Sequence, residues 1–170
     1  FWGDSIEQEL RSPNFVAWNL LLWSFVFFAA ERFSTQKKMA KTSIERMTLG
    51  KVFFIGFAQA IALLPGTSRS GITISGGLLA NLSPTSAARF SFLLGTPIIL
   101  SAGIYKSLYF LTSPIDSESL SALQLGIGLL VSFSIGYLSI KLLLGIVSRL
   151  GLMPFIIYRI VLAMSILTAL

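Results

Sequence analysis

The sequence has 170 residues, of which 54% are hydrophobic and 12% charged, and its mean hydropathy is +0.81. This composition lies outside the range of soluble domains and predicts an integral membrane protein. The sequence contains no cysteine and no histidine. A disulfide framework, thiolate chemistry and histidine nucleophiles, general bases or metal ligands are therefore excluded within this sequence.

The net charge of +6 is concentrated in one stretch. Six of the basic residues lie close together in the sequence: Arg32, Lys37, Lys38, Lys41, Arg46 and Lys51. In a membrane protein such a cluster is typical of a cytoplasmic loop rather than of a nucleic-acid patch. We therefore expect the bilayer, and no nucleic acid, among the partners.

Apolar runs predict the following helices in chain order. Residues 14–30 predict a first membrane-spanning helix, and residues 87–110, 120–147 and 155–170 predict three later spans, the last of them short. The runs do not alternate every second residue as barrel strands do. The expected fold is thus an all-α integral membrane protein, a helical bundle. The chain opens with Phe1 and shows no signal-peptide pattern, so we expect 1–170 to be a single transmembrane domain fragment with an upstream portion missing.

Between the first and second of these spans lie two apolar runs, residues 52–64 and 72–82, each well below the ~20 residues of a spanning helix. A Pro-Gly pair separates them, and Gly71 would permit a sharp reversal into the second run. Such a pattern predicts a re-entrant helical hairpin over residues 52–82, with its tip at "PGTSRSG". The distribution of charges supports this path. The basic residues place 32–51 and 141–149 on the inner side of the membrane, and the acidic N-terminal segment and residues 111–119 on the outer side. This assignment holds only if the hairpin returns to the side from which it entered.

The tip of this hairpin is suited to binding an anion. The amides at the start of the second limb, the positive end of its helix dipole and several hydroxyls would surround Arg69, whose planar guanidinium matches a phosphate or carboxylate. The hydroxyls alone could be packing or capping residues, but an arginine beside glycines at a helix start favours anion binding, most of all of phosphate. Arg159 and Lys141, near predicted span ends, are interpreted as snorkelling residues. No carboxylate falls inside any apolar run, so a general base or metal ligand near Arg69 would have to come from elsewhere.

The segments "GFAQAIALLPGTSRSGITISGGLL", "SAARFSFLLGTPIIL" and "MPFIIYR" resemble the C-terminal part of the bacterial undecaprenyl-diphosphate phosphatases, also known as bacitracin-resistance proteins. The resemblance covers nearly the whole chain. It implies one half of an inverted-repeat fold with two re-entrant hairpins, of which residues 52–82 are the second. The first hairpin, with a glutamate-rich motif, a serine pair and a histidine, is not found in this sequence.

The resemblance also implies a function. Members of the family are multi-pass enzymes of the bacterial inner membrane that release phosphate from undecaprenyl diphosphate, which recycles the lipid carrier for cell-wall synthesis and gives bacitracin resistance. Their activity requires a divalent cation, Mg²⁺ or Ca²⁺, whose ligands we expect in the missing N-terminal portion, and no metal ligand is assigned here. The expected partners are the polyprenyl diphosphate lipid, the bilayer and, as an open alternative, a second copy of the chain in a homodimer.

By the same resemblance Arg69 and Ser68 are the catalytic candidates. The substrate-binding candidates are Gly66, Thr67, Ser70, Gly71 and Thr73. A serine of the missing hairpin, Ser68 and a metal-bound water all stay open as the nucleophile. We expect the fragment alone to be inactive. A lipid-phosphate flippase or transporter is the alternative function, because re-entrant hairpins also occur in transporters.

Overall fold

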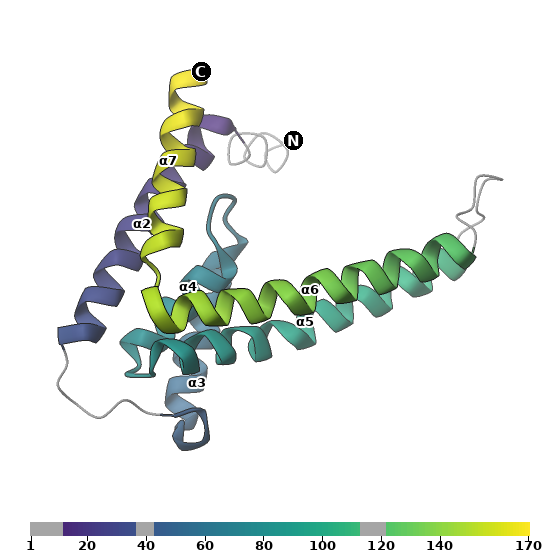
Figure 1. Ribbon diagram of the computed structural model, residues 1–170, viewed down its shortest axis with the longest axis horizontal. Coiled ribbons are helices and arrows are strands. Elements are labelled where there is room, and N and C mark those ends of the chain that lie inside the picture. Colours follow the sequence, from purple (N-terminus) through teal and green to yellow (C-terminus); the bar gives the residue numbers. More distant parts are fainter. Residues whose placement is uncertain (1–11, 37–42, 113–121) are drawn as a thin grey trace, which may run out of the picture.

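The computed structural model describes residues 12–36, 43–112 and 122–170, and every secondary-structure element in these ranges is a helix (Figure 1). The elements are α2 (Pro13–Gln36), η1 (Ile44–Arg46), α3 (Leu49–Ala60), η2 (Ile61–Leu63), α4 (Arg69–Leu79), α5 (Pro84–Thr112), α6 (Ala122–Leu150) and α7 (Met153–Ala169). Three of these helices are long and apolar enough to cross a membrane, over Pro13–Thr35, Pro84–Tyr109 and Leu123–Leu150. The prediction of an all-α integral membrane protein is therefore confirmed.

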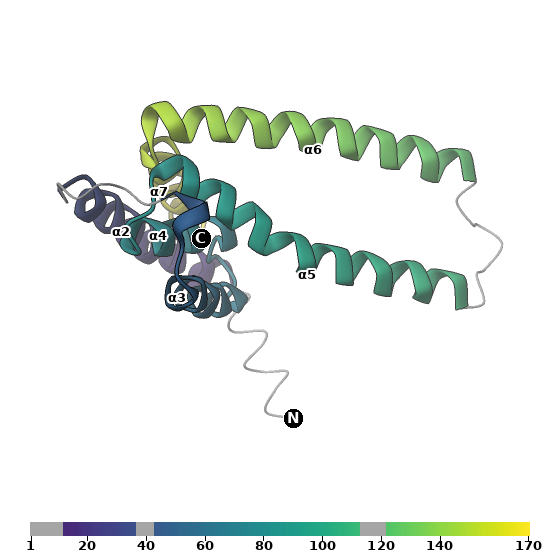
Figure 2. The same ribbon diagram turned by 90° about the horizontal axis from the view of Figure 1, so that it is seen from below.

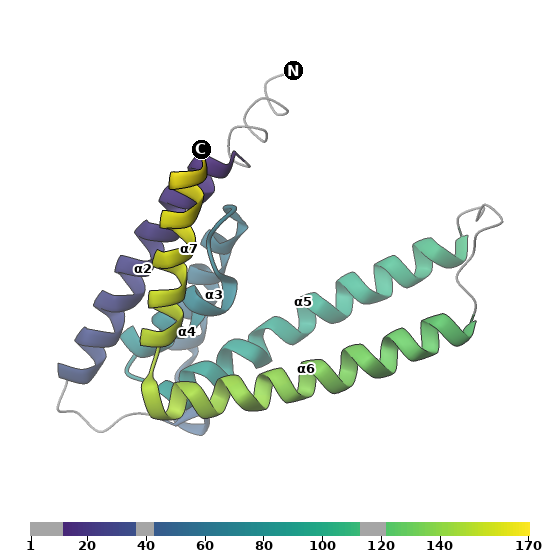
Figure 3. The ribbon, with the colours of Figure 1, turned by 45° about the horizontal axis from the view of Figure 1, so that its top comes forward.

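Helix α7 lies where the last, short span was predicted, over residues 155–170. It is apolar and has 17 residues. At about 1.5 Å of rise per residue it is shorter than the hydrocarbon core of ~30 Å, and its path through a bilayer stays a prediction. It lies along α2 for most of its length, and the two helices run in opposite directions (Figures 1 and 3).

Helices α5 and α6 form an arm that extends away from the α2–α7 pair (Figures 1 and 2). Only 6% of the apolar window of α6 is buried within the chain, against 33% for α2. Most of the arm therefore presents apolar side chains outward, as expected of a surface that faces lipid or other membrane segments.

Helix α4 is at the centre of the described structure, where it packs against α2, α3 and α5. Its residues from Ile72 to Leu78 are all buried. Gly77 allows α5 to come close, because a Cβ atom at this position would lie 2.8 Å from the Cβ of Ala87. The small side chains of α4 thus let three neighbours surround one short helix.

Helices α3 and α4, joined through η2, form the expected helical hairpin. They have 12 and 11 residues, and both are too short to span a bilayer. The entry and the exit of the hairpin lie together, since η1 packs against α5 and Glu45 interacts electrostatically with Arg89. This arrangement agrees with a hairpin that returns to its starting side, although its position relative to a bilayer stays a prediction.

Several predictions concern residues outside the described ranges. These are the acidic N-terminal segment before residue 12, residues 37–42 of the basic loop and residues 113–119 of the outer loop. The assignment of membrane sides from the charges therefore also stays a prediction.

Candidate anion site

A tight turn between the two limbs of the hairpin fixes the start of the site. Gly66 has a φ of +81°, a conformation that glycine adopts without strain. A Cβ atom at Gly66 would also lie 3.0 Å from the carbonyl oxygen of Val16 in α2. Backbone conformation and the proximity of α2 therefore both require glycine at this position.

Helix α4 begins at Arg69, three residues before the predicted limb. Ser68 is its N-cap, and the Ser68 hydroxyl accepts a hydrogen bond from the Gly71 amide at 3.2 Å. Arg69 and Ser70 therefore belong to the first helical turn, where amides lack intrahelical acceptors and the dipole is positive.

The expected reversal at Gly71 was wrong. Gly71 lies inside the first turn of α4, and the chain reverses at Gly66 instead. A Cβ at Gly71 would come within 2.5 Å of the Phe27 ring of α2. The missing side chain therefore allows close packing of two helices rather than a turn.

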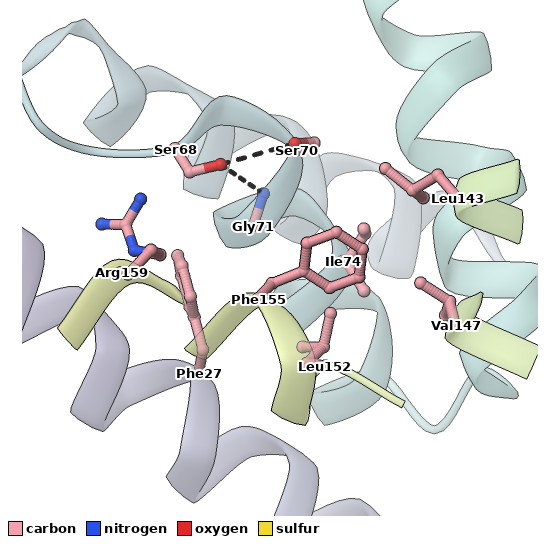
Figure 4. Close-up of a pocket in the computed structure, with 10 residues that line it drawn as sticks. All are labelled: Phe27, Ser68, Ser70, Gly71, Ile74, Leu143, Val147, Leu152, Phe155 and Arg159. Carbon is pink, nitrogen blue, oxygen red and sulfur yellow. Dashed lines mark hydrogen bonds between the residues drawn. The ribbon is translucent and has the colours of Figure 1, made fainter. Parts of the chain in front are cut away.

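A pocket opens beside this first turn (Figure 4). Ser68, Ser70 and Gly71 form one wall, and the two serine hydroxyls lie 3.4 Å apart. Arg159 of α7 also lines the pocket, and its guanidinium lies toward the same end as Ser68 (Figure 4). The other lining residues are apolar: Phe27, Ile74, Leu143, Val147, Leu152 and Phe155. Hydroxyl groups and a cation thus gather in an otherwise apolar pocket.

The interpretation of Arg159 as a snorkelling residue was wrong. Its side chain is 9% exposed and turns inward from α7, where Nη2 donates to the Gly66 carbonyl at 2.9 Å. The guanidinium carbon lies 5.2 Å from the centre of the Phe27 ring, a cation–π contact. The Nε–H is buried without an acceptor among the described residues. An arginine within a short apolar helix is the signal that could have identified it.

The guanidinium of Arg69 lies outside this pocket. It packs on Gly95 of α5, where an added Cβ would come within 2.5 Å of Nη2 and 2.9 Å of Cζ. Arg69 is not among the residues that line the pocket of Ser68 and Ser70. The first turn of α4 therefore directs its arginine toward α5 and its serines toward α7.

Thr73 and Thr67 are each held by a neighbouring helix. Thr73 is buried, its hydroxyl donates to the Arg69 carbonyl at 2.9 Å, and it lies 2.6 Å from the Ser91 hydroxyl of α5. The Thr67 hydroxyl accepts a hydrogen bond of 3.0 Å from Nδ2 of Asn19 in α2. Asn19 and Ser91 carry no signal in the sequence, because neither stands near the motif.

Two acidic residues, Glu31 and Glu45, lie in the described ranges. Glu31 lies just outside the apolar run of residues 14–30, but α2 continues past that run and includes it. Oε1 of Glu31 accepts the Leu152 amide at 2.9 Å, at the start of α7. In these ranges no three potential metal ligands of the acidic, cysteine or histidine type come together.

The chain resembles known proteins over nearly its whole length. Residues 1–165 match the family model described as bacitracin resistance protein BacA. The undecaprenyl-diphosphatase of Colwellia psychrerythraea is 42% identical over 96% of this chain and 59% of its own length. Those of Teredinibacter turnerae and Saccharophagus degradans are 38% and 41% identical, over 99% and 94% of this chain and 61% and 57% of their own length. The chain thus spans about three fifths of the length of these curated relatives.

Proposed function

The chain belongs to the bacitracin resistance protein BacA family, and from this premise we propose that it carries part of the active site of an enzyme that hydrolyses undecaprenyl diphosphate to undecaprenyl phosphate and phosphate. The reaction would recycle the lipid carrier for cell-wall synthesis in the bacterial inner membrane and give bacitracin resistance. The names of the relatives favour hydrolysis over translocation of the lipid.

The first turn of α4 is the observation that carries this proposal. It combines amides without intrahelical acceptors, the positive end of the dipole and the hydroxyls of Ser68 and Ser70, with the guanidinium of Arg69 on the α5 side of the same turn. Phosphoryl transfer depends mainly on positioning the phosphate and on neutralising its charge, and these groups supply both. Arg69 and Ser68 are thus our catalytic candidates, Arg69 for the phosphate charge and Ser68 as a donor or nucleophile.

In this proposal the other candidate residues contribute in different ways. Gly66 and Gly71 allow the backbone to adopt the turn and to pack closely, and Thr67 and Ser70 offer hydroxyl groups at the tip. Thr73 acts from the interior, because its hydroxyl is already bonded to the Arg69 carbonyl and lies against Ser91. Arg159 adds a second cation whose Nε–H still lacks an acceptor among the described residues.

A divalent cation, Mg²⁺ or Ca²⁺, is the cofactor that we propose for the whole enzyme. Hard cations of this kind prefer carboxylate oxygens. The described residues do not fit such a site, because one oxygen of Glu31 caps α7 and no cluster of three ligands is present among them. The ligands would therefore lie in a part of the enzyme that precedes the hairpin.

Phosphate release tests the proposal. The full gene product, purified in detergent, is incubated with undecaprenyl diphosphate and Mg²⁺, Ca²⁺ or a chelator, and free phosphate is measured. We expect release with at least one cation, and release slower by on the order of a hundredfold from an Arg69→Ala variant that accumulates to the same level. A wild-type protein that releases no phosphate with either cation would contradict the assignment.

A further inference from the structure

The hairpin tip is held by two helices that lie outside the hairpin. Asn19, at the side of α2, donates through Nδ2 to the Pro65 carbonyl at 2.5 Å and to the Thr67 hydroxyl at 3.0 Å. Arg159, on α7, donates to the carbonyl of the intervening residue, Gly66, at 2.9 Å. Three consecutive residues of the turn are therefore held by side chains that lie 46, 93 and 48 positions away from them in the sequence.

The side chain of Asn19 is buried at this position. It is 7% exposed, in a helix whose outward side chains are mostly apolar. A buried amide in such a helix is unfavourable unless its hydrogen bonds are made. Both hydrogens of the Asn19 amide group have an acceptor in the turn, one on the backbone and one on a side chain. No neighbour in α2 is needed to satisfy these donors.

The contacts of Asn19 lie directly before the residues that would bind phosphate. Thr67 is followed by Ser68, the N-cap, and by Arg69, the first residue of α4. The position of this turn therefore sets the direction in which the first amides of α4 and the serine hydroxyls point. A displacement of about 1 Å in a site of this kind can reduce a rate by about a hundredfold.

We infer that Asn19 is a positioning residue of the anion site: by holding the Pro65 carbonyl and the Thr67 hydroxyl, it aims the start of α4 at the phosphate. This inference rests on the proposed function, because the site that it orients is the one proposed above. Asn19 does not line the pocket, so it acts through the turn rather than by touching the substrate.

Kinetics of Asn19 variants of the full gene product provide the first test. Asn19→Ala removes both donors, and Asn19→Asp keeps the size of the side chain but places an oxygen against the Pro65 carbonyl. We expect kcat to fall by about tenfold to a hundredfold in both variants, with KM within about threefold of wild type, because a misaimed phosphate site loses interactions made in the transition state rather than uniform binding. Ser24→Ala is the matched control, since Ser24 is buried in the same helix and bonds only within it, to the Leu20 carbonyl.

Coupling to Thr67 separates positioning from general damage. Thr67→Val removes the acceptor of one Asn19 bond while keeping the shape of the side chain. If Asn19 acts through the turn, adding Asn19→Ala to Thr67→Val should lower kcat by less than Asn19→Ala does alone. Fully multiplicative effects, or an Asn19→Asp enzyme with the kcat of wild type, would overturn the inference.

Amide hydrogen exchange provides a readout that does not depend on turnover. Amides of residues 66–71 should exchange faster in Asn19→Ala than in wild type, and at the wild-type rate in Ser24→Ala. If the wild-type enzyme releases no phosphate, the proposed function fails, and this measurement still decides whether Asn19 holds the turn. Equal exchange in Asn19→Ala and Ser24→Ala would reject that role.

Discussion

At the scale of single residues, two arginines reach the hairpin tip by different routes. Arg69 is part of the first turn of α4 and lies against a glycine of α5, whereas Arg159 comes from α7 and holds the Gly66 carbonyl. One of the Arg159 donors is thus committed to the protein. The guanidinium of Arg69 is the better candidate for a bidentate contact with phosphate.

Replacing Arg69 tests this assignment. Arg69→Ala and Arg69→Lys should both lower kcat for phosphate release, by on the order of a hundredfold or about 3 kcal/mol for the alanine variant. The lysine keeps the charge but loses the planar fork, so it should also be impaired. Arg149→Lys, an exposed substitution near the end of α6, is the control. Unchanged turnover in Arg69→Lys would refute the role, and a Ser68→Ala enzyme slower than Arg69→Ala would point to Ser68 as the nucleophile.

Gly95 offers a way to move Arg69 without changing it. A Cβ at Gly95 would meet the far end of the flexible Arg69 side chain, so the guanidinium must shift while the fold is kept. Gly95→Ala should lower kcat by about tenfold or more, yet leave the melting temperature in detergent equal or higher, because alanine favours a helix by up to about 1 kcal/mol over glycine.

Gly103→Ala provides the matched control for this experiment. Gly103 lies in the same helix, and no atom lies within 4 Å of the position that its Cβ would take. This variant should be as stable as Gly95→Ala and keep wild-type kcat. Equal activity in both variants would show that the contact between Arg69 and Gly95 has no part in the reaction.

At the scale of elements, the junction of α6 and α7 depends on a glycine and a carboxylate. Gly151 has a φ of +66°, and Oε1 of Glu31 occupies the space that a Cβ there would need. The same oxygen accepts the Leu152 amide at the start of α7, where negative charge is favourable. The bond between α2 and this junction therefore sets where α7 begins.

Gly151→Ala should therefore destabilise the protein. The backbone conformation alone costs about 1–2 kcal/mol for a residue with a Cβ, and the displaced carboxylate adds to this. A lower melting temperature in detergent is the expected result, with Gly145→Ala in α6 as the control, because a Cβ at Gly145 would meet no atom within 4 Å. If Gly151→Ala and Gly145→Ala had the same melting temperature, an alanine at Gly151 would not cause the strain that the structure implies.

At the scale of the whole molecule, the membrane path of the hairpin decides the topology of everything that follows it. Two short limbs and an adjacent entry and exit predict that residues 52–82 return to the side from which they came. Because the sequence has no cysteine, Lys51→Cys and Ser83→Cys each provide a single label. A membrane-impermeant maleimide should label both variants from the same side, and labelling from opposite sides would disprove the re-entrant path.

The sequence predicts the helices well because apolar runs of this length have few alternatives in a membrane. The limbs of the hairpin and the Pro65–Gly66 turn follow from local patterns, whereas the direction of the Arg69 guanidinium, away from Ser68 and Ser70 and toward Gly95, does not. Asn19 and Arg159 do not, because their role depends on which faces of α2 and α7 meet the turn. That arrangement arises from packing between helices, about which a motif of seven residues carries no information.

Among the three helices long enough to span a membrane, α6 and α5, which form the arm, are less buried by the chain than α2 is. Its outward apolar side chains would suit lipid, another part of the enzyme or a second copy of the chain. A homodimer therefore stays a prediction, and the size of the complex in detergent would test it.

The bond between Arg159 and Gly66 has a consequence for biosynthesis. A ribosome completes the PGTSRSG segment roughly ninety residues before it adds Arg159, so during that interval the turn has Asn19 but not its second donor. If the proposed anion site is correct, it would be complete only after α7 has been made and has packed along α2. A nascent chain that stops before α7 would carry every residue of the motif and still lack the bond from Arg159 to the Gly66 carbonyl, so the proposed phosphate site would form only once α7 is in place.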